Sequence, residues 1–93
     1  MAPTDHKAKT EAIFGTTHAS EQEYAEADAN GINLGIYWCL RDMDVPHEEV
    51  LDAHVKNIPL VTYAVARETL SHAEALDAFK QDPSMKAFTR YRH

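Results

Sequence analysis

The chain has 93 residues, of which 44% are hydrophobic and 26% charged, and its formal net charge is −6. This is the size and composition of one ordinary globular domain, and three glycines and four prolines argue against a disordered or loop-rich chain. The acidic balance argues against binding of nucleic acid, because a negative surface repels phosphate.

The sequence also carries no sign of a membrane or secreted protein. It has no apolar run of 18 residues, and its first residues lack the apolar segment of a secretory signal. The single cysteine, Cys39, cannot form an intramolecular disulfide. We therefore expect a cytoplasmic protein without a membrane partner.

Residues 1–19 form the first predicted element, and they do not match the rest of the chain. The stretch KTEAIF can form one or two helical turns. The segment that follows carries Trp38, whose apolar surface needs a cover. We predict that this N-terminal segment packs on the first repeat, with Ile13 and Phe14 over Trp38.

Residues 20–93 contain a repeat of about 25 residues. The motif His-x-Glu-x-Leu-Asp-Ala at 47–53 returns at 72–78. At a shift of 26, another set of residues returns in the same order, namely Glu23/Glu49, Ala27/Ala53, Ile32/Ile58, Leu34/Leu60, Tyr37/Tyr63 and Arg41/Arg67. Such self-similarity is typical of helical repeat proteins. We predict a single all-α domain of three copies, at 20–43, 46–69 and 71–93.

Each copy is expected to form two short helices around a tight turn. The first helix begins at a Ser-x-x-Glu capping box at Ser20 and Ser71, or at Pro46 in the second copy. It ends at residues that terminate helices, which are Asn30-Gly31, Asn57 and Asp82-Pro83.

The second helix of each copy places an apolar residue at every third or fourth position. One such hairpin cannot bury its apolar stripe alone, so we predict three helix-turn-helix-like hairpins packed as a short α-repeat bundle. Two groups should form its core: Ala27, Ala53 and Ala78 at close helix contacts, and Leu34, Leu60, Met85, Tyr37, Tyr63 and Phe88 in a ladder.

Residues 51–68 also resemble a helix-turn-helix of a DNA-binding transcriptional regulator. The spacing of Ala53, Asn57 and Tyr63 suits two packed helices and a tight turn. However, the expected recognition helix carries Arg67 as its single basic residue, and residues 20–78 hold twelve acidic against three basic residues. DNA binding is therefore the alternative and not the preferred hypothesis.

Charged residues and histidines recur in register as well. An acid of the first helix (Glu26, Asp52, Asp77) and an arginine of the second (Arg41, Arg67, Arg92) predict a repeated salt-bridge network. His47 and His72 begin successive first helices, and we expect them to bond the preceding loop rather than share a metal. Cys39 is expected to be a buried, unreactive thiol. No catalytic motif is present, so we expect neither an enzyme nor a cofactor.

The stretch PHEEVLDAHVKNIPLVTYAVARETLSHAEALDAF resembles a tandem helical-hairpin repeat of actinobacterial and phage proteins. The shared pattern is Ser/Thr-His-x-Glu-x-Leu-x-Ala, a Gly/Asn-Ile/Val-x-Leu turn, and Tyr-x-x-Ala-Arg. Pro46 departs from it at the first position, and Asp82-Pro83 departs at the third turn. The resemblance implies a small, non-enzymatic, phage-encoded protein that binds or inhibits a host protein in the bacterial cytoplasm.

Two surfaces could make that contact. One is the acidic face of the first helices, with Glu23, Glu26, Glu48, Glu49 and Asp52. The other is an apolar flank of Ile36, Trp38, Val61 and Val65 on the second helices, which would also favour a homodimer.

Overall fold

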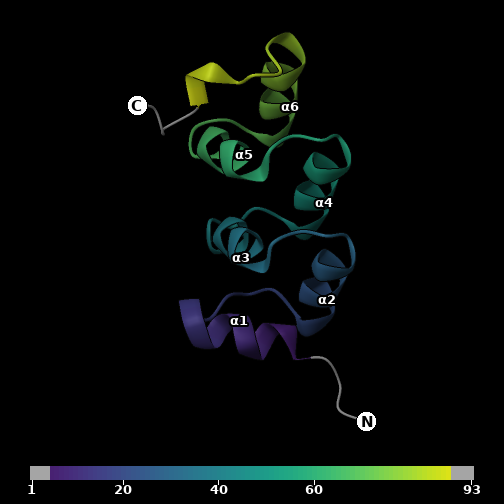
Figure 1. Ribbon diagram of the computed structural model, residues 1–93. Coiled ribbons are helices and arrows are strands. Elements are labelled where there is room, and N and C mark those ends of the chain that lie inside the picture. The colour runs from purple at the N-terminus through teal and green to yellow at the C-terminus, as the bar shows by residue number, and fades with distance from the viewer. Residues whose placement is uncertain (1–4, 89–93) are drawn as a thin grey trace. The chain divides into compact units, whose positions relative to one another are not determined.

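A computed structural model describes residues 5–88, and every regular element in this range is a helix. These elements are α1 (His6–Phe14), α2 (Glu21–Ala29), α3 (Leu34–Asp42), α4 (His47–Val55), α5 (Leu60–Arg67), α6 (His72–Gln81) and the short 3₁₀ helix η1 (Lys86–Phe88) (Figure 1). The prediction of an all-α chain of tandem hairpins is confirmed. The expected second helix of the third copy is represented by η1, and its remaining residues, Arg92 included, lie outside the described range.

The helix boundaries follow from the capping residues. The hydroxyls of Ser20 and Ser71 accept hydrogen bonds from backbone N–H groups, and the glutamate three residues later bonds back, which completes a capping box at each site. Gly31 and Asn57 have φ of 82° and 65°, in the left-handed region, where α2 and α4 end. Local sequence alone therefore sets where these helices start and stop.

The described chain divides into two compact units, Met1–His47 and Glu48–His93. In the first unit α1 contacts both α2 and α3. The rings of Tyr24 and Tyr37 are fully buried and meet edge to face, with centroids 5.2 Å apart. These two rings and the buried side chain of Leu40 form the centre of this unit.

The N-terminal helix is held to α3 through Trp38. The Phe14 ring lies 5.3 Å from the Trp38 ring, and the indole Nε1–H donates a 2.9 Å hydrogen bond to the carbonyl of Gly15. Ile13 does not share this cover, because 75% of it is exposed. Phe14 and the backbone of Gly15, which has φ of 121°, therefore do the covering.

In the second unit, α5 contacts both α6 and η1. Seven described side chains there are buried almost completely: Val50, Ala53, Ile58, Tyr63, Ala66, Ala75 and Met85. The expected core differs in detail, since Leu34, Leu60 and Phe88 are only half-buried. Leu34 and Leu60 are the first residues of their helices, where one side of the turn faces solvent.

The third copy departs from the other two where its second helix should begin. Ala78 is half-buried, and Ala75 takes the closest contact in its place. Asp82 leaves the helical conformation with φ of −144°, and Met85 adopts φ of 48°. The proline at 83 and this turn produce a 3₁₀ helix instead of a full α-helix.

None of the described helices has the length and apolar character that crossing a membrane requires.

Candidate functional site

The recurring polar residues of the first unit form one hydrogen-bonded cluster, which we call the first network: Glu23, Glu26, Tyr37, Arg41 and His47. The Arg41 guanidinium donates to the Tyr37 hydroxyl at 2.7 Å and to Glu23 Oε1 at 2.8 Å. The Tyr37 hydroxyl lies 2.7 Å from His47 Nδ1, and His47 Nε2 lies 2.7 Å from Glu26 Oε1. The first residue of α4 is thereby bound to both α2 and α3.

The second unit repeats this cluster as the second network: Glu49, Asp52, Tyr63, Arg67 and His72. Arg67 donates to Tyr63 and to Glu49, each at 2.7 Å. The Tyr63 hydroxyl lies 2.7 Å from His72 Nδ1, and His72 Nε2 lies 2.8 Å from Asp52 Oδ2. The first residue of α6 is thereby bound to both α4 and α5.

Donors and acceptors match throughout both networks in one protonation pattern. The tyrosine oxygen accepts from arginine, so its O–H donates to Nδ1 of the histidine. Nε2 then carries the hydrogen and donates to the carboxylate. Among the described residues no buried side-chain nitrogen or oxygen lacks a hydrogen-bond partner. A fully paired polar cluster of this kind fixes the positions of its own side chains.

The pKa values of the network residues follow from burial and pairing. Burial raises the pKa of Tyr37 to about 12, although the bond from Arg41 opposes the shift. Burial also raises the pKa of Tyr63, opposed in the same way by Arg67. For Glu23, burial acts to raise the pKa, but the hydrogen bonds from Arg41 and from the Ser20 N–H outweigh it and hold the pKa below its usual range.

The salt bridges join different acids from those predicted. Arg41 and Arg67 bind Glu23 and Glu49, whereas Glu26 and Asp52 bind the histidines. Glu23 and Glu49 lie three positions before Glu26 and Asp52, and the rotation of α2 and α4 turns these earlier residues toward the arginines. Asp77, the equivalent in the third copy, accepts a hydrogen bond from Gln81, and its expected partner Arg92 lies outside the described residues.

The part played by the histidines was missed at the sequence level. His47 and His72 were expected to bond the preceding loop, but each bonds a tyrosine and an acid. A signal was present, because both histidines follow a recurring tyrosine by nine or ten residues. The apolar periodicity of the second helices counts Tyr37 and Tyr63 as core residues and takes no account of their hydroxyls.

No family model, no curated protein and no solved structure matches this chain. The site must therefore be interpreted from its own chemistry.

That chemistry offers little for catalysis or metal binding. In residues 5–88 no group of three or more His, Cys, Asp or Glu side chains could hold a metal ion. The Cys39 thiol is exposed, which corrects the expectation of a buried one, because it lies on the outer side of α3. In each network the arginine, tyrosine and histidine are directed at one another. Their geometry stabilises a helix junction.

The predicted acidic contact face is largely engaged within each unit. Glu23, Glu49 and Asp52 have side chains 31%, 32% and 37% exposed, and each is in an ion pair. Glu26 is more exposed but holds His47. Glu48 is exposed and forms no ion pair with another described residue.

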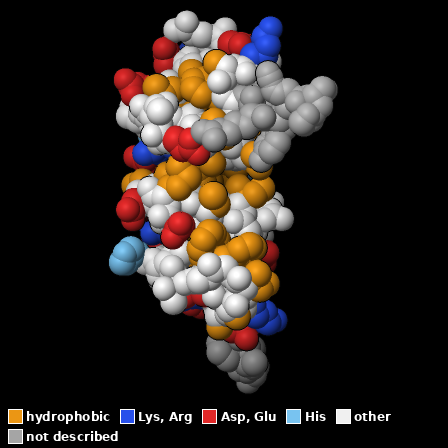
Figure 2. Space-filling model, turned by 90° about the vertical axis from the view of Figure 1, so that its left-hand side faces the viewer, with side chains coloured by type: hydrophobic (Ala, Val, Ile, Leu, Met, Phe, Trp, Pro, Cys, Tyr) orange, Lys and Arg blue, Asp and Glu red, His pale blue; other side chains and the backbone are white. Residues whose placement is uncertain are grey.

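The predicted apolar flank is only partly accessible. Trp38 is half-buried beneath Phe14, and Ile36 and Val65 are half-buried as well. Val61 on α5 is 44% exposed. Figure 2 shows apolar side chains, in orange, that reach the surface of the molecule.

Proposed function

We propose that this chain is a small, non-enzymatic protein-interaction module that binds a bacterial host protein. The observation that carries the proposal is the contrast between its charged and apolar side chains. The recurring charged residues are bound inside each unit, while Val55 and Val61 of the second unit are 69% and 44% exposed. Exposed apolar side chains on a well-packed scaffold favour contact with another protein.

The resemblance to phage and actinobacterial repeat proteins supports the choice of a host protein as partner. A packed helical hairpin can act by occupying a surface of that partner, and it needs no chemistry of its own. We propose inhibition or redirection of a cytoplasmic host factor as the outcome. A homodimer through the same apolar side chains would compete with this partner for the surface.

The alternative of a DNA-binding regulator has less support. The expected recognition helix, α5, has Arg67 as its single base, and the Arg67 side chain is only 14% exposed. Its guanidinium bonds Glu49, Tyr63 and the carbonyl of Leu70. A base edge or phosphate would have to displace these bonds. A gel-shift titration against duplex DNA at low and high salt tests this alternative directly.

Affinity capture from a bacterial lysate, followed by mass spectrometry, identifies candidate partners. Binding of the purified candidate is then measured with Val61→Asp and, as a matched surface control, with Glu48→Lys. We expect Val61→Asp to weaken binding at least about tenfold, because it places a charge in an apolar contact. Glu48→Lys should change affinity by less than about twofold. A larger loss of affinity for Glu48→Lys than for Val61→Asp would place the contact on the acidic face. Equal affinity of the unmodified chain and both variants would refute the proposal. Glu49→Lys is unsuitable because it also breaks the bond to Arg67.

A further inference from the structure

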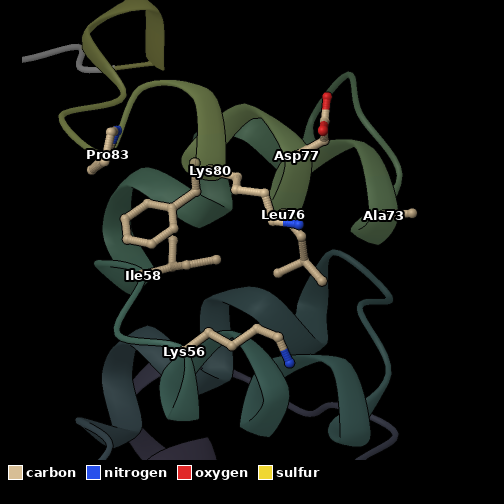
Figure 3. Close-up of a pocket in the computed structure, with 8 residues that line it drawn as sticks. Lys56, Ile58, Ala73, Leu76, Asp77, Lys80 and Pro83 are labelled. Atoms are coloured by element: carbon tan, nitrogen blue, oxygen red, sulfur yellow. The ribbon is translucent and has the colours of Figure 1, made fainter.

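A groove of about 490 Å³ lies in the second unit, between the turn that links α4 to α5 and one side of α6 (Figure 3). Its walls include the apolar side chains of Ile58, Leu76 and Phe79. This volume falls in the range of ordinary ligand sites, roughly 300–1,000 Å³. The groove is therefore large enough for several apolar side chains of a partner.

The residues of α6 that line the groove differ from those of the preceding copy. Phe79 and Lys80 stand where the second copy has His54 and Val55. The Phe79 ring is only half-buried, and Lys80 is exposed. A half-exposed aromatic ring beside a lysine offers a ligand both an apolar surface and a positive charge.

The charge of the groove is opposite to that of the chain as a whole. Lys56 and Lys80 both line it, in a protein whose formal net charge is −6. Among the described residues Lys80 has no ion-pair partner, and Lys56 is paired with the half-buried Asp52, at 2.6 Å. The one acid in the lining, Asp77, accepts a hydrogen bond from Gln81. An acidic ligand that the rest of the chain repels would thus be attracted here.

The two lysines lie at opposite edges of the apolar surface. In Figure 3 the side chains of Lys80 and Lys56 lie above and below, with Ile58 and Leu76 between them. A ligand that uses both lysines needs carboxylates separated by an apolar face. An amphipathic helix with acidic residues meets this requirement, whereas a fatty acid carries one carboxylate.

We propose that this groove binds an acidic amphipathic helix of the partner protein, which deepens the proposed function and rests on it. Apolar side chains of that helix, three or four residues apart, pack on Leu76 and Phe79, above Ile58, which is 3% exposed. Its Asp or Glu carboxylates pair with Lys56 and Lys80. The acid that pairs with Lys56 takes the place of Asp52, which keeps its bond to His72.

The test uses the full chain and a fluorescently labelled helical peptide of Glu, Ala and Leu, with leucine at every third or fourth position. Binding is followed by fluorescence anisotropy. The double variant Lys56→Glu/Lys80→Glu should weaken binding roughly tenfold, because it removes two ion pairs and places negative charges against the acidic peptide. Lys86→Glu is the matched control for the single variants Lys56→Glu and Lys80→Glu, because it makes the same change of charge as either of them, in the same unit, at an exposed residue outside the groove lining. Circular dichroism checks that all variants retain their helices.

A second peptide, with Lys in place of Glu, distinguishes recognition from a loss of folding. It should bind the double variant more tightly than the unmodified chain. The proposal is overturned if the Glu peptide does not bind, if Lys86→Glu weakens it equally, or if a labelled fatty acid binds the groove in its place. The proposed function is tested separately with the captured partner. If Val61→Asp abolishes binding of that partner and the double variant binds it normally, the groove proposal is rejected and the proposed function is retained.

Discussion

The hydroxyl of Tyr63 offers the sharpest test of the networks, because one atom joins two helices. Tyr63→Phe removes this oxygen and leaves the ring in place. Tyr63 is fully buried, and its oxygen lies 2.7 Å from both Arg67 Nη1 and His72 Nδ1. The substitution therefore leaves each of two partners with one hydrogen bond fewer.

The expected loss follows from the type of each bond. A hydrogen bond from a charged donor contributes about 1.5–3 kcal/mol, and a neutral one about 0.5–1.5 kcal/mol. Arg67 keeps its bonds to Glu49 and to the Leu70 carbonyl, and the His72 side chain is 18% exposed, so water replaces part of the loss. We expect Tyr63→Phe to lower the free energy of unfolding by about 2–3 kcal/mol.

Urea unfolding followed by far-UV circular dichroism measures this loss. Tyr37→Phe is a matched comparison, because it removes the same two bonds in the first unit. Combining Tyr63→Phe with His72→Leu should reveal a coupling energy of about 1 kcal/mol or more. A loss below about 0.5 kcal/mol, the size of an ordinary surface substitution, or strictly additive effects would refute the structural role of the hydroxyl.

Three further outcomes are expected. Hydrogen bonds from Lys56 and His72 hold the pKa of Asp52 below its usual range. The ionised carboxylate therefore stabilises the fold above its unfolded pKa, about 3.9, and this stabilisation is lost as pH falls through the folded pKa. Urea midpoints measured between pH 6 and 2 should fall less steeply for Asp52→Asn than for the unmodified chain. Because burial raises the pKa of Tyr37 to about 12, tyrosine absorbance at alkaline pH should show a late-ionising group that Tyr37→Phe removes, and its absence would contradict the burial. Ala53→Leu should lower the unfolding free energy by about 1–3 kcal/mol through overpacking of a fully buried site, and an unchanged urea midpoint would show that the helices can separate.

The fold was predictable because local and repeated signals agree. Ser20 with Glu23, and Ser71 with Glu74, mark helix starts by chemistry that acts over three residues. Gly31 and Asn57 mark helix ends, because few other residues adopt positive φ. The recurrence of these signals at a fixed interval then implies that the hairpins are alike, without knowledge of any long-range contact.

The site was less predictable because it depends on rotation and distance. Glu23 and Glu26 lie three residues apart on α2, and composition cannot tell which of them faces Arg41 and which faces His47. The pairing of Tyr37 with His47 depends on how α3 meets the start of α4. The groove beside Phe79 depends on where the chain turns after α6, and no periodic pattern encodes that turn.

The equivalence of the two networks has an evolutionary consequence for this gene. An in-frame deletion of residues 47–71 would place His72 directly after Pro46, ten positions beyond Tyr37, where His47 stands now. The shortened product would retain a tyrosine, an arginine and a histidine at the spacing that already closes the junction. Recombination between copies could thus lengthen or shorten the protein by whole hairpins, because the same side chains would form the network at the new junction.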